Sequence, residues 1–156
     1  MSQFSELSKP IDDANGDDLD ISAESVDLPA EPVEDSMIKH RTLADTPLRK
    51  YFERAIKYEA SDLLMRGDYV PRLRVRGSLK ALNTKPIPIE LFEKAIRGSL
   101  TKSQWTTFTQ RGAIDLGVDF DLEDGSIHRF RINIFRTRGQ TALAARRVVG
   151  AGADED

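Results

Sequence analysis

Between residues 47 and 149 the hydrophobic residues recur with two different periods, a helical period and a period of two residues, and these periods predict the secondary structure. Asp45-Thr46-Pro47 places a capping side chain before a proline, an arrangement typical of a helix start. The apolar residues that follow lie at helical spacing on one face: Leu48, Tyr51, Phe52, Ala55 and Ile56. We therefore expect an amphipathic helix that ends near Ala60.

Three short strands are expected next, at about 63–65, 72–76 and 79–82, with a turn at Gly67-Asp68. In the second of these, Leu73 and Val75 alternate with Arg72, Arg74 and Arg76. This alternation predicts a half-buried strand with its arginines on the outer face.

Two helical patterns follow the prolines at 86 and 88. The first carries an apolar stripe over 91–96 and stops at Gly98. The second opens with Thr101-x-x-Gln104, a capping-box pattern, and ends at Gly112. We expect two short helices between two groups of strands.

The second group of strands is expected at about 114–122, 127–135 and 140–149. In the first of these segments every second residue from 114 to 122 is apolar, and these residues alternate with Asp115, Gly117, Asp119 and Asp121. Pairing Leu122 with His128 would set Phe120 against Phe130 and would bring Asp121 opposite Arg129 and Asp119 opposite Arg131. In this predicted register Phe130 faces the core and Phe135 lies on the arginine face.

The order of elements is helix, three strands, two helices, three strands. This order predicts one α+β domain: a mixed, mainly antiparallel sheet with helices packed on one face. We place it at residues 43–149, between an acidic leader at 1–42 and an acidic tail at 150–156.

Charge is strongly segregated along the chain. Residues 1–36 hold eleven acidic residues against Lys9 alone, whereas residues 37–153 hold 22 basic and 12 acidic residues. The leader has too few apolar residues to offset the entropy of ordering, so we expect leader and tail to be disordered. Two interpretations of the leader are open: it is a solubilising extension, or it is an acidic arm that competes for the basic domain or contacts a partner.

Several classes of function are disfavoured. The chain has no cysteine, and its two histidines, His40 and His128, have no ligand-like spacing, so no metal site is expected. There is no Walker A or Walker B motif, and we expect no nucleotide hydrolysis by this chain alone. No signal-peptide pattern or apolar stretch of membrane-spanning length is found, which favours a cytoplasmic protein without membrane insertion.

The arginines are the candidate functional residues. They cluster on the expected strands, and a planar guanidinium suits phosphate oxygens. The alternative interpretation is that these arginines form ordinary surface salt bridges. The segment Arg129-Phe130-Arg131-Ile132-Asn133-Ile134-Phe135 superficially suggests an RNA-reading strand but lacks the required glycine and Phe-x-Phe pattern, so nucleic acid is not the favoured partner.

Three segments, in this order, resemble the N-terminal domain of PilT-type pilus retraction ATPases of the type II/IV secretion ATPase superfamily. They are Ala60-Ser61-Asp62-Leu63-Leu64-Met65, then Val70-Pro71-Arg72-Leu73-Arg74-Val75-Arg76-Gly77, then Arg129-Phe130-Arg131-Ile132-Asn133-Ile134-Phe135-Arg136-Thr137-Arg138-Gly139. The resemblance covers roughly residues 47–149.

This resemblance implies a PAS-like domain that precedes a RecA-like ATPase core in a cytoplasmic homo-hexameric motor. It implies that Arg131 and Arg146, with Arg129 as a third candidate, contact in trans the phosphates of nucleotide held by such a core. ATP and Mg²⁺ are the implied cofactors of the full-length family, and none is implied for this chain alone. Twitching motility, secretion and DNA uptake are equally compatible processes.

The sequence departs from the family pattern at two positions and in length. Leu64 stands where the family usually has a histidine, and Arg76 stands where it usually has an acidic residue. No ATPase core follows residue 149, so we expect either a truncated motor or a stand-alone relative. Two alternatives remain open: a PAS-like adaptor or signalling module that binds a motor, and a basic nucleic-acid-binding domain regulated by the acidic leader.

Overall fold

A six-stranded sheet forms the centre of the fold in the computed structural model, which describes Pro32 and residues 41–148. The strands are β1 (Asp62–Arg66), β2 (Arg72–Val75), β3 (Ser78–Ala81), β4 (Ala113–Asp121), β5 (Ile127–Thr137) and β6 (Gln140–Arg147). The helices are the 3-10 turn η2 (Leu43–Asp45), α2 (Arg49–Lys57), α3 (Ile89–Gly98) and α4 (Lys102–Arg111). The predicted α+β class and the predicted order of elements are confirmed.

The spatial order of the strands is β3-β2-β1-β6-β5-β4, and every described strand pair is antiparallel. The first and second groups of strands therefore meet where β1 pairs with β6. This junction brings Asp62 opposite Arg146, two residues that lie far apart in the sequence. The sheet is thus continuous across both halves of the chain.

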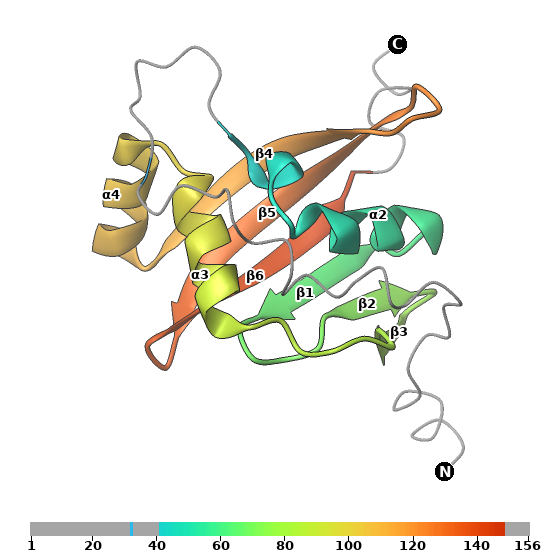
Figure 1. The fold of residues 1–156 in the computed structure, drawn as a ribbon, viewed down its shortest axis with the longest axis horizontal. Helices are drawn as coiled ribbons and strands as arrows, with labels where there is room; N and C mark the ends of the chain where they lie inside the picture. The colour runs from blue at the N-terminus through green and yellow to red at the C-terminus, as the bar shows by residue number, and fades with distance from the viewer. Residues whose placement is uncertain (1–31, 33–40, 149–156) are drawn as a thin grey trace.

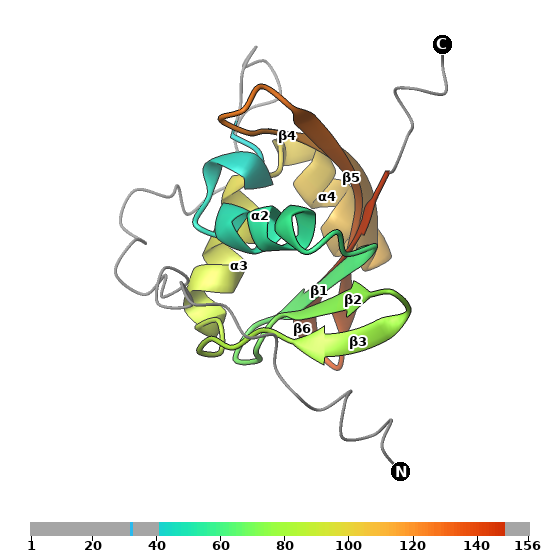
Figure 2. The same cartoon turned by 90° about the vertical axis from the view of Figure 1, so that its right-hand side faces the viewer.

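Helices α2 and α3 lie against one face of the sheet, whereas α4 lies at the end where β4 begins (Figures 1 and 2). The side chains between the layers are fully or almost fully buried, among them Tyr51 and Phe52 of α2, Phe92 of α3, and Phe120 and Phe130 of the sheet. Phe52 stacks on Phe120 with ring centroids 4.5 Å apart and meets Phe130 edge-on at 5.1 Å. This aromatic cluster holds α2 on the sheet.

The helix ends follow the sequence signals in part. The capping box at Thr101 and Gln104 is present, and α4 ends at Gly112, whose φ of 80° lies in the left-handed region. The predicted start of the first long helix is wrong in detail: Asp45 completes a capping box with Thr42 around η2. The Thr46 hydroxyl instead accepts a bond from Leu48 N at 3.2 Å, and α2 ends at Lys57 rather than near Ala60.

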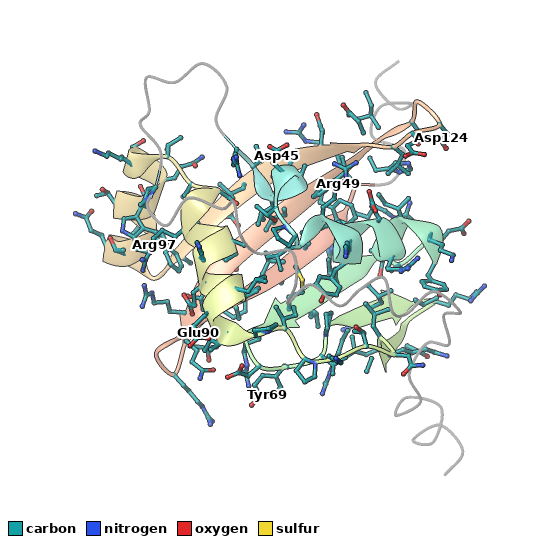
Figure 3. The ribbon with its side chains drawn as sticks, viewed as in Figure 1. Asp45, Arg49, Tyr69, Glu90, Arg97 and Asp124 are labelled. Carbon is teal, nitrogen blue, oxygen red and sulfur yellow. The ribbon has the colours of Figure 1, made fainter. Side chains whose placement is uncertain are left out.

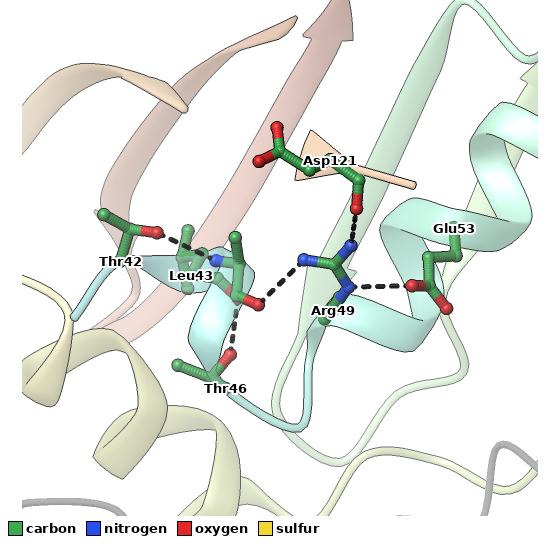
Figure 4. A network of polar contacts seen from close by, with 7 residues as sticks. Thr42, Leu43, Thr46, Arg49, Glu53 and Asp121 are labelled. Atoms are coloured by element: carbon green, nitrogen blue, oxygen red, sulfur yellow. Dashed lines mark hydrogen bonds and ion pairs between the residues drawn. The ribbon is translucent and has the colours of Figure 1, made fainter. Parts of the chain in front are cut away.

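Arg49 connects three elements at the entry to the domain (Figure 4). Its guanidinium donates to Glu53 Oε2 at 2.7 Å within α2, to the carbonyl of Ala44 in η2 at 3.2 Å, and to the carbonyl of Asp121 in β4. Each bond involves a charged donor, which strengthens it relative to a neutral hydrogen bond. The start of the described domain is thereby anchored beside the edge strand β4.

The predicted register of the β4–β5 hairpin is wrong by two residues. Phe120 pairs with His128, Asp119 pairs with Arg129, and Gly117 pairs with Arg131. The turn determines this outcome: Gly125 N bonds to Leu122 O, Leu122 N bonds to Ser126 O, and Gly125 has a φ of 90°. These bonds define a three-residue loop with glycine in the left-handed position. A shift of two residues keeps every side chain on its predicted face, so Phe130 is buried as expected.

Two other hairpins close with Arg-Gly turns. Val75 pairs with Ser78 and Thr137 pairs with Gln140, which leaves two residues in each loop. Both residues have positive φ in each case: 51° and 82° at Arg76 and Gly77, and 55° and 79° at Arg138 and Gly139. These values indicate type I′ turns. Arg76 is therefore in a turn, and the prediction that it lines a strand face with Arg72 and Arg74 is wrong.

The predicted acidic leader and tail fall almost entirely outside the described residues. Within the described part, no helix is long and apolar enough to cross a bilayer.

Candidate anion-binding face of the sheet

The face of the sheet opposite α2 and α3 carries most of the strand arginines. Alternation along the strands places Arg72 and Arg74 of β2, Arg66 of β1, Arg146 of β6, and Arg129 and Arg131 of β5 on this outer face. The inner positions between them, such as Leu73, Ile132 and Ala145, are buried. The outer face therefore presents a group of cations on a rigid support.

One row of this face crosses four neighbouring strands. Arg131 pairs with Arg146, Arg146 pairs with Asp62, and Asp62 pairs with Arg74. Asp62 lies between two arginines: its Oδ1 is 3.3 Å from Arg146 Nε and its Oδ2 is 3.5 Å from Arg74 Nε. The row contains three guanidinium groups and one carboxylate, which leaves an excess of positive charge.

Arg131 is the member of the row without a counterion. It makes no hydrogen bond or ion pair with any residue that the structure describes. Its neighbour on β4 is Gly117, the one position where the acidic series Asp115, Asp119 and Asp121 is interrupted. Its neighbour on β6 is another arginine, and like charges directly opposite each other destabilise a sheet. An anion bound between Arg131 and Arg146 would relieve this repulsion.

Arg129 is in a different situation from Arg131. Its Nη1 lies 2.9 Å from Asp119 Oδ1, and both side chains are about half exposed. Its guanidinium extends over Gly117. Arg131 and Arg146 are cross-strand neighbours. Arg146 shares the carboxylate of Asp62 with Arg74, Arg129 is paired with Asp119, and Arg131 has no counterion among the described residues.

A shallow depression of about 280 Å³ lies over this row. Its charged and polar lining residues are Arg131, Arg146, Asp62, Asp115 and Asn133. Asn133 Nδ2 donates to Asp115 Oδ1 at 2.9 Å, and Asp62 accepts a bond from Arg146, so both carboxylates of the lining already have partners. The depression is large enough for a phosphate-sized group and open enough for that group to be presented by another molecule.

An apolar depression of about 300 Å³ adjoins the row on the outer face. Leu64, Val70, Phe135 and Ala142 line it, with Tyr69 at its rim. Tyr69 is 48% exposed, and the Arg66 guanidinium stacks on its ring at 4.0 Å from the centroid. Figure 3 shows Tyr69 at the border of the sheet, far from the hairpin tip that carries Asp124. Leu64 contributes to this apolar surface.

Asp62 is the residue of this site that sequence reasoning missed. It belongs to the Ser61-Asp62-Leu63 segment, but its role depends on the pairing of β1 with β6, which no local pattern predicts. Phe135 lies on the arginine face as predicted, but it lines the apolar depression and is only partly exposed.

Residues 41–148 give little support for a metal site or for acid–base chemistry. Over this range, no three His, Asp or Glu side chains are grouped as metal ligands would be. One carboxyl group has a perturbed pKa: the hydroxyl and backbone amide of Ser126 hydrogen-bond to Asp124 and lower the pKa of that carboxyl group. Asp124 lies in the β4–β5 turn, where this network stabilises the loop.

No protein-family model and no curated protein sequence matches this chain. Solved structures do match. One is the pilus retraction motor PilT with bound ADP, with a TM-score of 0.51 and 24% identity over 69% of this chain. The ATPases DotB of Legionella pneumophila and DotB of Yersinia pseudotuberculosis match with a TM-score of 0.55 and 16% identity, over 77% and 78% of this chain.

The chain spans only 29% to 36% of the length of these ATPases. The matched part is their N-terminal portion, so the fold is similar to that of the N-terminal domain of PilT and DotB. The resemblance inferred from the three sequence segments is thereby confirmed at the level of the fold.

Proposed function

We propose that this chain is the non-catalytic N-terminal domain of a PilT-like or DotB-like secretion or pilus motor. In this role its outer face meets a RecA-like ATPase core of the same or a neighbouring subunit in a cytoplasmic homo-hexamer. Arg131 and Arg146 contact the phosphates of ATP or ADP, with Mg²⁺, held by that core. The similarity of fold supports the type of domain, and the arginine pair supports the contact.

The observation that carries the proposal is the unpaired Arg131 beside Arg146. A surface that served only solubility would gain from a carboxylate at position 117, because every neighbouring outward position of β4 from 115 to 121 carries one. Because residue 117 is glycine, the guanidinium of Arg131 has no carboxylate opposite it on β4 and remains free on a rigid strand. A charge-assisted contact that forms only when the two domains close would couple the nucleotide state to domain movement.

The partner core can be tested on the endogenous protein. An antibody against residues 101–149 would be used on extract of the source cells, and the recognised product would be sized and sequenced by mass spectrometry. The proposal predicts a product much larger than 17.5 kDa that contains Walker motifs, or a 17.5 kDa product in a stable hexameric complex with an ATPase. A 17.5 kDa product that associates with no ATPase would contradict it and favour the adaptor function.

A further inference from the structure

We propose that residues 17–28 of the acidic N-terminal segment bind the outer face of the sheet in the same molecule and cover Arg131, Arg146 and the apolar depression beside them. This inference concerns a contact within the chain. It does not depend on the proposed motor function, because it requires no ATPase.

Charge complementarity is the first argument. Over β5, β6, β1 and β2 the outer face presents Arg131, Arg146, Arg66, Arg72 and Arg74 against the single carboxylate of Asp62. Residues 17–28 contain five acidic residues and no basic residue. The acidic side chains of β4 lie at one margin and repel the segment, which favours a position over the arginines.

The apolar residues of the segment supply the second argument. Leu19 and Ile21 alternate with Asp18 and Asp20, and Val26 and Leu28 flank Asp27. The outer face has the matching arrangement, since the arginine row adjoins a depression of about 300 Å³ lined by Leu64, Val70, Phe135 and Ala142. A segment with both acidic and apolar residues can therefore contact both parts of the face at once.

The connection is long enough for this contact. The described domain begins beside β4, the edge strand, because η2 packs against β4. Twelve residues lie between Leu28 and Arg41, and the thirteen chain steps from one to the other span at most about 45 Å when fully extended. Passing from the helix layer around the sheet edge to the outer face takes about 20 Å at a layer spacing of about 10 Å, and crossing from β4 to β6 takes about 10 Å at a strand spacing of about 4.8 Å, so the connection is long enough. Tethering also raises the effective concentration to about the millimolar range, so a weak contact suffices.

A second copy of the chain is a poorer occupant. A two-fold symmetric contact through this face would place the same arginines of both molecules against each other, because such an interface uses one patch twice. That arrangement would add like-charge repulsion instead of removing it.

The reactivity of individual arginines towards phenylglyoxal tests the proposal in the full-length chain, with mass spectrometry as the readout. In the wild type at low salt, Arg131 and Arg146 should react at least about threefold more slowly than in D17N/D18N/D20N/E24Q/D27N, the ratio for a face covered two-thirds of the time. Arg111 of α4, an exposed arginine of another element, should react equally in both proteins. The protection should disappear in 1 M salt, where the Debye length is about 3 Å.

A second variant tests the apolar contribution. L19S/I21S keeps all five acidic residues, and it should also lose protection of Arg131 and Arg146. Equal reactivity of these arginines in the wild type and the neutralised variant would overturn the proposal, as would unchanged protection in L19S/I21S. Protection that increases with protein concentration would also contradict it, because a contact within one molecule is independent of concentration.

Discussion

Replacement of Gly117 by aspartate should restore the carboxylate that Arg131 lacks. Gly117 is the cross-strand partner of Arg131, and its φ is not positive, so a residue with a side chain fits the backbone. A Cβ atom there would lie 2.6 Å from an Nη atom of Arg129, which is the end of a flexible side chain and can move aside. The new carboxylate would then lie between two guanidinium groups.

The expected gain in stability has two parts. Removing glycine from a strand contributes about 0.5–1 kcal/mol, and an opposite-charge pair across neighbouring strands contributes about 0.2–1 kcal/mol. Moving Arg129 from its exposed pair with Asp119 costs at most about 1 kcal/mol. Gly117→Ala provides the matched control, because it makes the same backbone change without the charge. We expect Gly117→Asp to be more stable than Gly117→Ala by up to about 1 kcal/mol.

Urea unfolding of Gly117→Asp, Arg131→Ala, their combination and the wild type would measure the coupling between the two positions. The structure predicts a favourable coupling of about 0.2–1 kcal/mol at low salt, and a smaller coupling when Gly117→Asp is combined with Arg146→Ala. Zero coupling with Arg131, or a Gly117→Asp protein less stable than Gly117→Ala, would refute the reasoning. It would also bring the two-residue correction of the hairpin register into question.

Three other outcomes follow from the structure. Arg138→Asn should raise the free energy of unfolding by about 1 kcal/mol in a thermal or urea melt, because asparagine tolerates the positive φ of this turn better than arginine. A loss of stability in this variant would contradict the assignment of the turn. Phe120→Ala should cost about 3–5 kcal/mol, since the ring is fully buried and stacked on Phe52, and a loss below 1 kcal/mol would contradict that packing. The lowered pKa of Asp124 means that its carboxylate stabilises the fold above the ordinary pKa of 3.8 and that this stabilisation is lost as the pH falls through the folded value. Ser126→Ala should reduce this acid-dependent loss in melts between pH 2 and 5, because it deletes the hydroxyl bond to Asp124 and keeps the backbone bond; an unchanged pH dependence would contradict the role of the hydroxyl.

The faces of the strands could be predicted from the sequence because alternation is local. Phe120 and Phe130 are buried on one face and Arg129 and Arg131 lie on the other, as predicted, whereas the position of Arg146 beside Arg131 depends on the pairing of β5 with β6. The register was not predictable from charge pairing, because two registers that differ by two residues bury the same side chains. The loop determines which of the two registers forms, because Gly125 supplies the left-handed residue of a three-residue turn.

The site itself depended on pairing between distant segments. Asp62 and Arg146 meet because β1 pairs with β6, and residue spacing carries no signal for this pairing. The role of Gly117 was also hidden, because a glycine within an acidic strand gains meaning only when its partner on β5 is known. The prediction that Arg76 lies on the strand is wrong because the period of two seen at Arg72 and Arg74 continues in the sequence to Arg76. The backbone has already left the strand there, since Arg76 has a positive φ and lies in the turn.

Under the proposed function, Arg131 and Arg146 would act on nucleotide held by an ATPase core. The most direct test is the ATP turnover of the proposed motor assembled with this chain, with Arg131→Ala, Arg146→Ala and the control Arg111→Ala compared at equal occupancy. Arg131→Ala and Arg146→Ala should each lower turnover at least about tenfold, which corresponds to about 1.4 kcal/mol of transition-state stabilisation, while Arg111→Ala should leave it unchanged. Unchanged turnover in both variants of the arginine pair, with the domain still folded and assembled, would contradict the proposed function.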